Sequence, residues 1–182
     1  MTNHIHADSK KEDYLQTAYL AGGCYWGLEE LIRQIPGVLY TKVGFSGGHI
    51  KNVSYKEVTK GDTGHAESIE VKFDSRELRY EDLLYNFFKM HDPTTVNQQG
   101  NDIGTQYRSV VFYKNDEQKL LAEESKIKVD ASSIFTNPVV TEISKLDKFW
   151  PAEDYHNNYY NNNKDQAYCR VVIKPKLDKL FT

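Results

Sequence analysis

The spacing of hydrophobic residues changes along the chain, and each spacing predicts one kind of secondary structure. Five segments have the apolar patterns of strands, namely 16–21, 38–45, 68–73, 107–113 and 139–143. Alternation in the third segment places Ile69, Val71 and Phe73 on one face. The fourth segment is continuously apolar, as is typical of a buried strand, and the last alternates as an outer strand does.

Three helices are predicted between and after these strands. The first begins at Tyr25 and ends at Pro36, which cannot continue a helix. The second is an amphipathic stripe over 80–88. The third opens at Asn115, which has capping-box spacing, and extends to about Val129.

The first six predicted elements follow the order strand, helix, strand, strand, helix, strand. This is the order of the ferredoxin-like split βαβ arrangement. We therefore predict an α/β (α+β) fold with a ferredoxin-like core and an added C-terminal strand, helices and coil. Residues 1–182 are predicted to form a single domain with a flexible arm over 1–13 and a C-terminal segment over 164–182.

The composition narrows the classes of function. The chain has 182 residues, of which 39% are hydrophobic and 27% charged, as in a soluble globular protein. Its 23 basic and 26 acidic residues argue against nucleic acid or an anionic membrane as the main partner. The sequence shows neither an apolar leader nor a run of 18 apolar residues, so the cytoplasm is the expected location.

Two cysteines, Cys24 and Cys169, are too few for a disulfide scaffold or a four-cysteine zinc site. In a reducing compartment both would rest as thiols, and a disulfide between them would more often be catalytic than structural. No metal site is predicted.

Cys24 follows Gly22-Gly23 at the predicted start of a helix. Free amide groups and the helix dipole favour an anion there, by roughly 0.3–2 kcal/mol. This would lower the thiol pKa by about one from ~8.5, which predicts a partial thiolate that needs another partner. The alternative is that Cys24 is a small buried hydrophobic residue.

Two aromatic residues follow the cysteine directly. Tyr25 and Trp26 could simply pack in the core, and this alternative is stronger for Tyr25. Beside a thiol, they could instead wall a small apolar pocket that fits a methyl or thioether group.

Glu67 stands where a loop meets the strand 68–73. Carboxylates at such junctions usually lie in solvent. If Glu67 faced an apolar pocket, desolvation would raise its pKa and make it a general acid. Nearby His65 is predicted to support the turn rather than to bind a metal.

A long polar segment, 91–108, lies between a predicted helix and a predicted strand. Loops of this length are often functional, and its glycines match no phosphate-binding motif. Asp102 and Tyr107 could hydrogen-bond a polar ligand. The alternative is a loop whose polar groups bond one another.

Four separate segments, in order, resemble the peptide methionine sulfoxide reductase A family. These are Gly23-Cys24-Tyr25-Trp26-Gly27, Thr63-Gly64-His65-Ala66-Glu67, the run 91–108 and Pro151-Ala152-Glu153-Asp154-Tyr155-His156. The resemblance extends over about 17–176, nearly the whole chain.

The resemblance implies a reaction and a set of roles. Cys24 would attack the sulfoxide and become a sulfenic acid, with Glu67 as general acid. The other family positions would bind substrate: Tyr55 and Tyr107 the sulfoxide oxygen, Tyr25 and Trp26 the methyl group, Asp102 the backbone, and His156 the substrate more generally. The substrate would be the S epimer of methionine sulfoxide, free or in proteins.

The same resemblance implies a monomer with no cofactor, recycled by an external dithiol such as thioredoxin. Two positions depart from the family. Position 25 is Tyr rather than Phe, which would put a hydroxyl at the rim of the methyl pocket. The C-terminal region offers one candidate resolving thiol, Cys169, and lacks a glycine-rich two-cysteine tail. Since the apolar run 171–173 follows, Cys169 could equally be a strand residue without a redox role.

Two other classes of function remain open from the sequence. A thiol peroxidase would also use a cysteine at a helix start, but would need a threonine or arginine near the thiol. A non-enzymatic ferredoxin-like binding module would leave Cys24 unreactive, since this fold hosts many functions.

Overall fold

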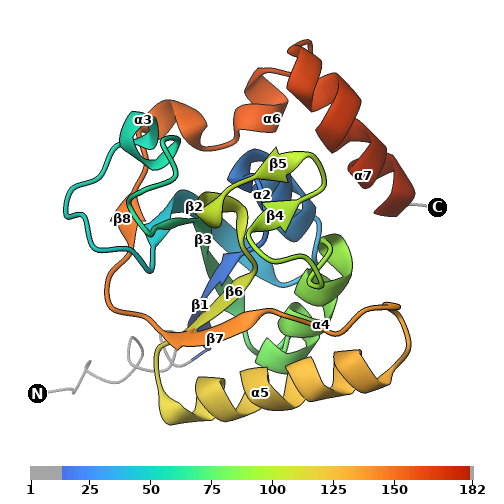
Figure 1. Ribbon diagram of the computed structural model, residues 1–182. Coiled ribbons are helices and arrows are strands. Elements are labelled where there is room, and N and C mark those ends of the chain that lie inside the picture. The colour runs from blue at the N-terminus through green and yellow to red at the C-terminus, as the bar shows by residue number, and fades with distance from the viewer. Residues whose placement is uncertain (1–13, 181–182) are drawn as a thin grey trace, which may run out of the picture.

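A six-stranded sheet forms the centre of the computed structural model, which describes residues 14–180 (Figure 1). Its four central strands are β1 (Leu15–Ala21), β2 (Val38–Ser46), β3 (Ala66–Asp74) and β6 (Val110–Tyr113). They lie in the order β6-β1-β3-β2, and every neighbouring pair is antiparallel. This is the predicted ferredoxin-like core.

Two strands extend the sheet, one at each edge. β7 (Glu142–Lys145) pairs with β6 in parallel, and β8 (Trp150–Pro151) pairs with β2 in antiparallel orientation. The outer strand predicted over 139–143 is β7, which starts only at Glu142. The Val139 amide is not available to the sheet because it donates to the Asp130 side chain. The Val140 amide donates to a loop carbonyl, that of Pro93.

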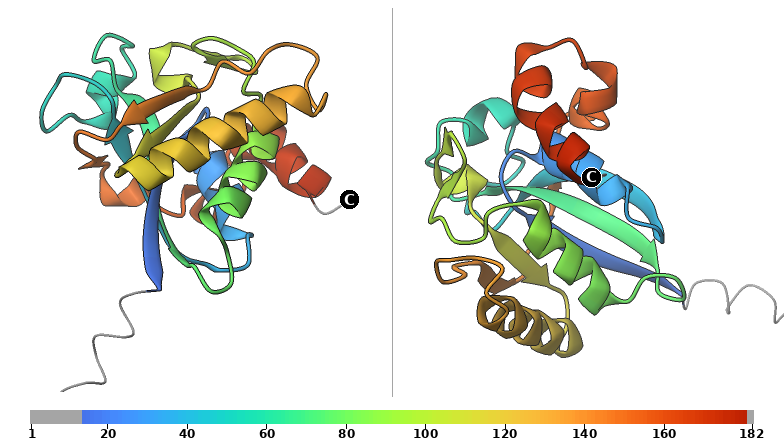
Figure 2. Two further views of the ribbon diagram at one scale, coloured as in Figure 1. Left: turned by 90° about the horizontal axis from the view of Figure 1, so that it is seen from below. Right: turned by 90° about the vertical axis from the view of Figure 1, so that its right-hand side faces the viewer.

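Three helices pack on one face of the sheet or along its edge (Figure 2). They are α2 (Tyr25–Arg33), α4 (Tyr80–Met90) and α5 (Asp116–Ala131). Apolar residues at helical spacing, such as Leu28, Leu31 and Ile32 of α2, are buried against the strands. As predicted, Asn115 caps α5 by accepting a hydrogen bond from the Gln118 amide at 2.9 Å.

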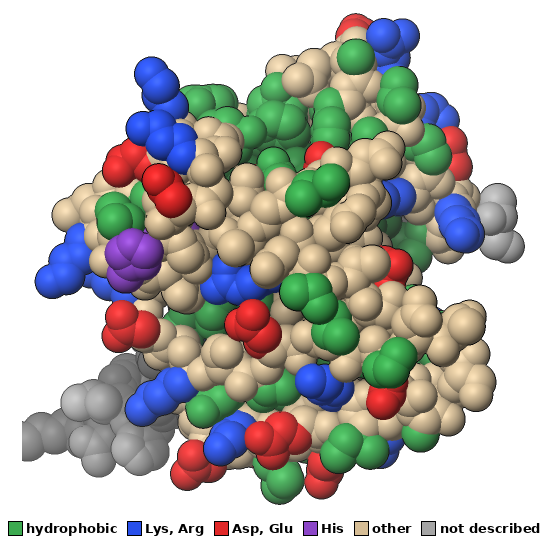
Figure 3. Space-filling view, in the orientation of Figure 1, with side chains coloured by type: hydrophobic (Ala, Val, Ile, Leu, Met, Phe, Trp, Pro, Cys, Tyr) green, Lys and Arg blue, Asp and Glu red, His purple; other side chains and the backbone are tan. Residues whose placement is uncertain are grey.

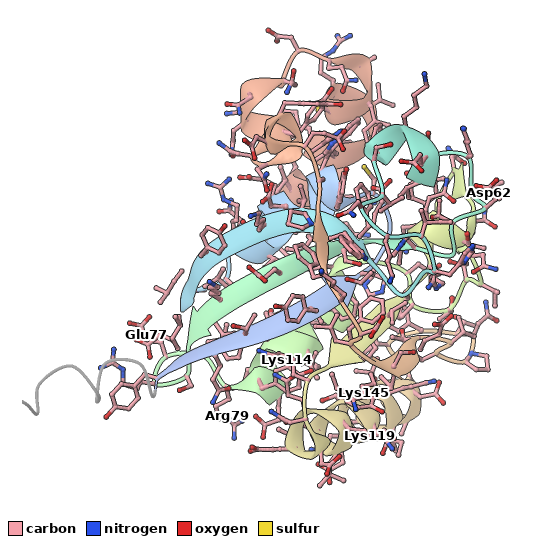
Figure 4. All side chains as sticks on the ribbon, turned by 90° about the vertical axis from the view of Figure 1, so that its left-hand side faces the viewer. Asp62, Glu77, Arg79, Lys114, Lys119 and Lys145 are labelled. Atoms are coloured by element: carbon pink, nitrogen blue, oxygen red, sulfur yellow. The ribbon has the colours of Figure 1, made fainter. Side chains whose placement is uncertain are left out.

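The other face of the sheet has a smaller apolar cluster. Tyr19, Ala21 and Phe112 belong to it, and Leu146 and Phe149 pack against it. Figure 4 shows this face, which the chain crosses on its way to β8; the labelled Asp62 and Glu77 precede and follow β3. Alternate residues of β1, β3 and β6 therefore serve two different cores.

Short elements surround the ends of the central strands where β1 ends and β3 begins. They are α3 (Tyr55–Val58), β4 (Gln98–Gln99), β5 (Asp102–Ile103), the 3₁₀ turns Thr105–Tyr107 and Asp154–His156, α6 (Tyr159–Asn162), the π-helix Cys169–Ile173 and α7 (Lys174–Leu180). The predicted strand over 107–113 therefore begins only at Val110, because the 3₁₀ turn ends at Tyr107.

The strand alternative for 171–173 is wrong, because this segment is helical. Cys169 and Ile173, four positions apart, face the core, while Val171 between them is 71% exposed. No helix within the described residues is long and apolar enough to cross a membrane. The predicted arm over 1–13 lies outside the described residues.

Candidate active site

Cys24 stands at the N-terminus of α2, directly after β1. Gly23 has φ of +88°, a left-handed conformation that favours glycine, and it turns the chain from the strand into the helix. Cys24 is the N-cap residue of α2. As a residue, Cys24 is partly exposed at the helix start.

Glu67 lies beneath this helix start. It shares the β3 face of Ile69, Val71 and Phe73, so the strand periodicity directs its side chain toward the helix-covered core. The side chain is only 1% exposed, and Oε1 accepts a hydrogen bond from the Tyr25 amide at 3.1 Å.

The Glu67 carboxyl is a weak acid in this position. Desolvation raises its pKa to about 8, although the Tyr25 amide opposes the shift. Glu67 therefore keeps its proton at neutral pH, as predicted for a carboxyl that faces an apolar pocket.

The prediction of a lowered Cys24 pKa is wrong for the resting protein. Desolvation raises the thiol pKa well above its usual value, and a charge on Glu67 raises it further. A hydrogen bond from the Trp26 amide and one with Tyr168 lower it, but they are weaker than desolvation. The helix terminus alone does not make a thiolate, so Cys24 rests as a thiol.

Two tyrosines predicted to hold the sulfoxide oxygen lie near this pair. Burial, followed by the charge of Glu67 and then of Cys24, raises the pKa of both Tyr55 and Tyr107. Both phenols are therefore neutral hydrogen-bond donors. Tyr55 is held at the start of α3, where its amide donates to Glu153 Oε1 at 3.1 Å.

Trp26 is fixed by Tyr159 and His156. Its ring stacks on Tyr159 with 3.8 Å between centroids, and Nε1 donates to His156 Nδ1 at 3.0 Å. Desolvation lowers the pKa of His156, so the ring is neutral and can accept this hydrogen bond.

His156 differs from the expectation that it binds substrate, because its side chain is 1% exposed and lies behind Trp26. Tyr25 also differs: it is fully buried against Phe45 and Tyr55. Its hydroxyl therefore does not lie at the pocket rim, and the packing interpretation holds for Tyr25.

Asp102 is joined to the nucleophile by a residue that the sequence did not single out. Tyr168 Oη donates to Asp102 Oδ2 at 2.5 Å and also hydrogen-bonds Cys24. Tyr168 could have been noticed only as the neighbour of Cys169.

Cys169 lies in different surroundings. It is fully buried, and its Sγ hydrogen-bonds Gln166 Oε1 at 3.5 Å. Desolvation raises its pKa. Both cysteines are free thiols. A negative charge on either sulfur would raise the pKa of Tyr159, after the larger effect of desolvation.

His65 supports its turn, as predicted. Its Nδ1 accepts from the Gly48 amide at 3.1 Å, so the proton is on Nε2, which bonds the Ile50 carbonyl at 2.7 Å. Within residues 14–180, no three His, Cys, Asp or Glu side chains are grouped as they would be around a metal ion.

Hydrophobic side chains gather in a hollow between α3 and α6, near the top of Figure 3. The site can therefore receive a small group with an apolar end and an oxygen that accepts protons. The site combines a thiol, a protonated carboxyl and neutral phenols on a ferredoxin-like fold. This combination is that of a thiol-dependent oxidoreductase.

Comparison with known proteins identifies the family. Residues 16–182 match the family described as peptide methionine sulfoxide reductase, and the chain belongs to it. It is similar to the MsrA of Vesicomyosocius okutanii, with 45% identity over 92% of this chain and 99% of the relative. The MsrA of Leptospira borgpetersenii is 47% identical over 91% of this chain and 93% of the relative.

Among solved structures, reduced Mxr1 from Saccharomyces cerevisiae has a TM-score of 0.81 and 32% identity, covering 93% of this chain and 95% of Mxr1. Methionine sulfoxide reductase A of Corynebacterium diphtheriae has a TM-score of 0.74 and 36% identity, covering 83% and 76%. The chain is thus an oxidoreductase that reduces methionine sulfoxide through thiol chemistry.

Proposed function

We propose that the chain reduces the S epimer of methionine sulfoxide to methionine, with Cys24 as nucleophile and Glu67 as general acid. The observation that carries the proposal is the buried, protonated Glu67 below the helix start that holds Cys24. A sulfoxide oxygen leaves poorly unless it is protonated. Glu67 supplies that proton, and general acid catalysis of this kind contributes about 10²–10⁴ in rate.

The first step forms a bond between Cys24 Sγ and the sulfoxide oxygen and breaks the sulfur–oxygen bond of the substrate. Methionine leaves reduced, and Cys24 becomes a sulfenic acid, oxidised by two electrons. The resting site holds two exchangeable protons, on the thiol and on the carboxyl. As Glu67 gives its proton to the oxygen, it becomes the base that accepts the thiol proton.

Tyr55 and Tyr107 support this step as neutral donors to the sulfoxide oxygen. Trp26, which stacks on Tyr159 and is hydrogen-bonded to His156, offers an apolar surface to the substrate methyl group. The hydrogen-bond donors lie on one side of the bound sulfoxide and the Trp26 indole on the other. In the opposite epimer the oxygen and the methyl group would exchange places, so the oxygen would face the indole and the methyl group the donors. This favours one epimer, and the family resemblance assigns it as S.

Cys169 is proposed to resolve the intermediate. Its thiol would condense with the Cys24 sulfenic acid, which forms a disulfide and releases water. An external dithiol, thioredoxin, would then reduce the disulfide by exchange. Cys169 is buried in the described state, and the proposal includes a rearrangement of the π-helix Cys169–Ile173 in this step.

The proposal extends to the setting of the enzyme. We propose a cytoplasmic monomer of one domain that requires no bound cofactor and acts on free and protein-bound methionine sulfoxide. Two free thiols are consistent with a reducing compartment.

The test is turnover of the separate S and R epimers of N-acetylmethionine sulfoxide, with dithiothreitol or thioredoxin as reductant. We expect methionine to form from the S epimer with both reductants. Peroxide consumption without sulfoxide reduction would replace the proposal with a thiol peroxidase.

A further inference from the structure

Gln99 touches the backbone immediately before the nucleophile. A Cβ built on Gly23 would lie 2.6 Å from Gln99 Cγ and 2.9 Å from its Cβ. The aliphatic part of Gln99 therefore packs directly against the turn that delivers Cys24 to α2.

The far end of the Gln99 side chain is fixed as well. Oε1 accepts from the Asp92 amide, and Nε2 donates to the Asp92 carbonyl, both at 3.0 Å. Gln99 is 7% exposed. Two hydrogen bonds to one backbone residue define the side-chain position, as in a pair of strands.

Gln99 is also the partner of Asp102 in the small β4–β5 hairpin. The two residues stand directly opposite each other, so their side chains project from the same face. Gln98, the preceding residue, pairs with Ile103 and projects from the other face. One buried side chain thus connects the Cys24 turn with the strand that carries Asp102.

We propose that Gln99 is a positioning residue that sets the separation of Cys24 and Asp102. It thereby makes the site selective for sulfoxides that carry a peptide backbone. The inference rests on the proposed function, in which the sulfoxide reaches Cys24, and on the backbone-binding role that the family resemblance implies for Asp102. A misplacement of about 1 Å between two such groups costs a factor of the order of 10².

The experiment compares two substrates in each variant. N-acetylmethionine sulfoxide has a backbone amide for Asp102, whereas dimethyl sulfoxide has the reacting group alone. In Gln99→Ala, we expect the ratio of kcat/KM for the first substrate over the second to fall at least about tenfold. A purely structural role would lower both values together, so an unchanged ratio in the folded variant overturns the proposal.

Gln98→Ala is the matched control, since it removes the same side chain from the other face of the hairpin. Its ratio is expected to stay within about twofold of the wild type; a fall as large as that in Gln99→Ala would overturn the proposal. Should Gln99→Ala fail to fold, the same ratio in Gln99→Met decides: this residue fills the space without the two hydrogen bonds, and its ratio should also fall.

A double variant tests whether Gln99 acts through Asp102. In an Asp102→Ala background, Gln99→Ala should lower the ratio by less than twofold further, because the group that it positions is gone. A full additional fall would contradict the proposal. Failure of the proposed function is distinguishable, because the wild type would then reduce neither sulfoxide.

Discussion

The surroundings of Cys24 and Cys169 differ in the groups that meet the sulfur. Cys24 is partly exposed, and its pKa responds to Glu67, Tyr168, Asp102 and the Trp26 amide. Cys169 is fully buried, and its pKa is raised by desolvation alone. Burial raises the pKa of both cysteines, so burial does not distinguish them. The proton donors and acceptors around the Cys24 sulfur are what make Cys24 the candidate nucleophile.

The largest expected effect separates the two thiols by mutation. Cys24→Ser should lose all measurable reduction of methionine sulfoxide, because a hydroxyl is a far weaker nucleophile than a thiol. Cys169→Ser should release methionine in a single turnover but fail to cycle with thioredoxin. Quenched-flow analysis of both variants checks this, and thioredoxin-driven cycling by Cys169→Ser would remove Cys169 from the account.

The acid beside Cys24 gives the next largest effect. Glu67→Gln keeps the shape of the side chain but cannot give up a proton, so the single-turnover rate should fall by at least about 10². Glu70→Gln is a suitable control, since this residue of the same strand accepts a hydrogen bond from Tyr19 on the other sheet face. A rate for Glu67→Gln within twofold of the wild type would exclude Glu67 as the acid.

The same variant should be more stable than the wild type at neutral pH. The pKa of Glu67 is about 8 in the folded protein against 4.5 for an ordinary carboxyl. Its contribution to stability is therefore fully present below pH 4.5 and is lost as pH rises through 8.

The glutamine side chain does not titrate, so the Glu67→Gln variant does not lose this stability as the pH rises. At pH 7 its free energy of unfolding should therefore exceed that of the wild type by up to about 3 kcal/mol. Urea denaturation of wild type and Glu67→Gln at pH 4.5, 6 and 7.5 measures the difference, which should grow with pH. A constant difference would show that Glu67 is already ionised in the folded protein.

The smallest expected effect concerns the residues that surround Trp26. His156→Phe removes the acceptor for the Trp26 indole and leaves a part-buried N–H unpaired. We expect kcat/KM to fall about tenfold and stability to fall by about 1–2 kcal/mol. Tyr155→Phe is the control, since Tyr155 contacts the same imidazole but is 63% exposed; equal losses in both variants would contradict a specific role for His156.

The sequence could predict what depends on periodicity. Alternation through Ile69, Val71 and Phe73 fixes β3, and the same alternation extended by one step points Glu67 into the core. Glycines before Cys24 predicted the turn into α2, and the family motifs predicted most of the residues that gather around it.

Other features depend on contacts that no local pattern encodes. Tyr168 meets Asp102 across 66 positions, and Trp26 meets His156 across 130. Cys24 was expected to be partly ionised because the helix terminus is visible in the sequence, whereas its desolvation is not. The run 171–173 is too short to tell a strand from a helix, and only packing decides.

The central claim is that Cys24 and a protonated Glu67 act as one chemical unit on the sulfoxide. Its most direct test is one turnover of Cys169→Ser without reductant, followed by peptide mass spectrometry and methionine analysis. The account predicts one methionine released per enzyme and one added oxygen atom, located on Cys24. Methionine release without oxygen on Cys24, or an equal yield from Cys24→Ser, would contradict it.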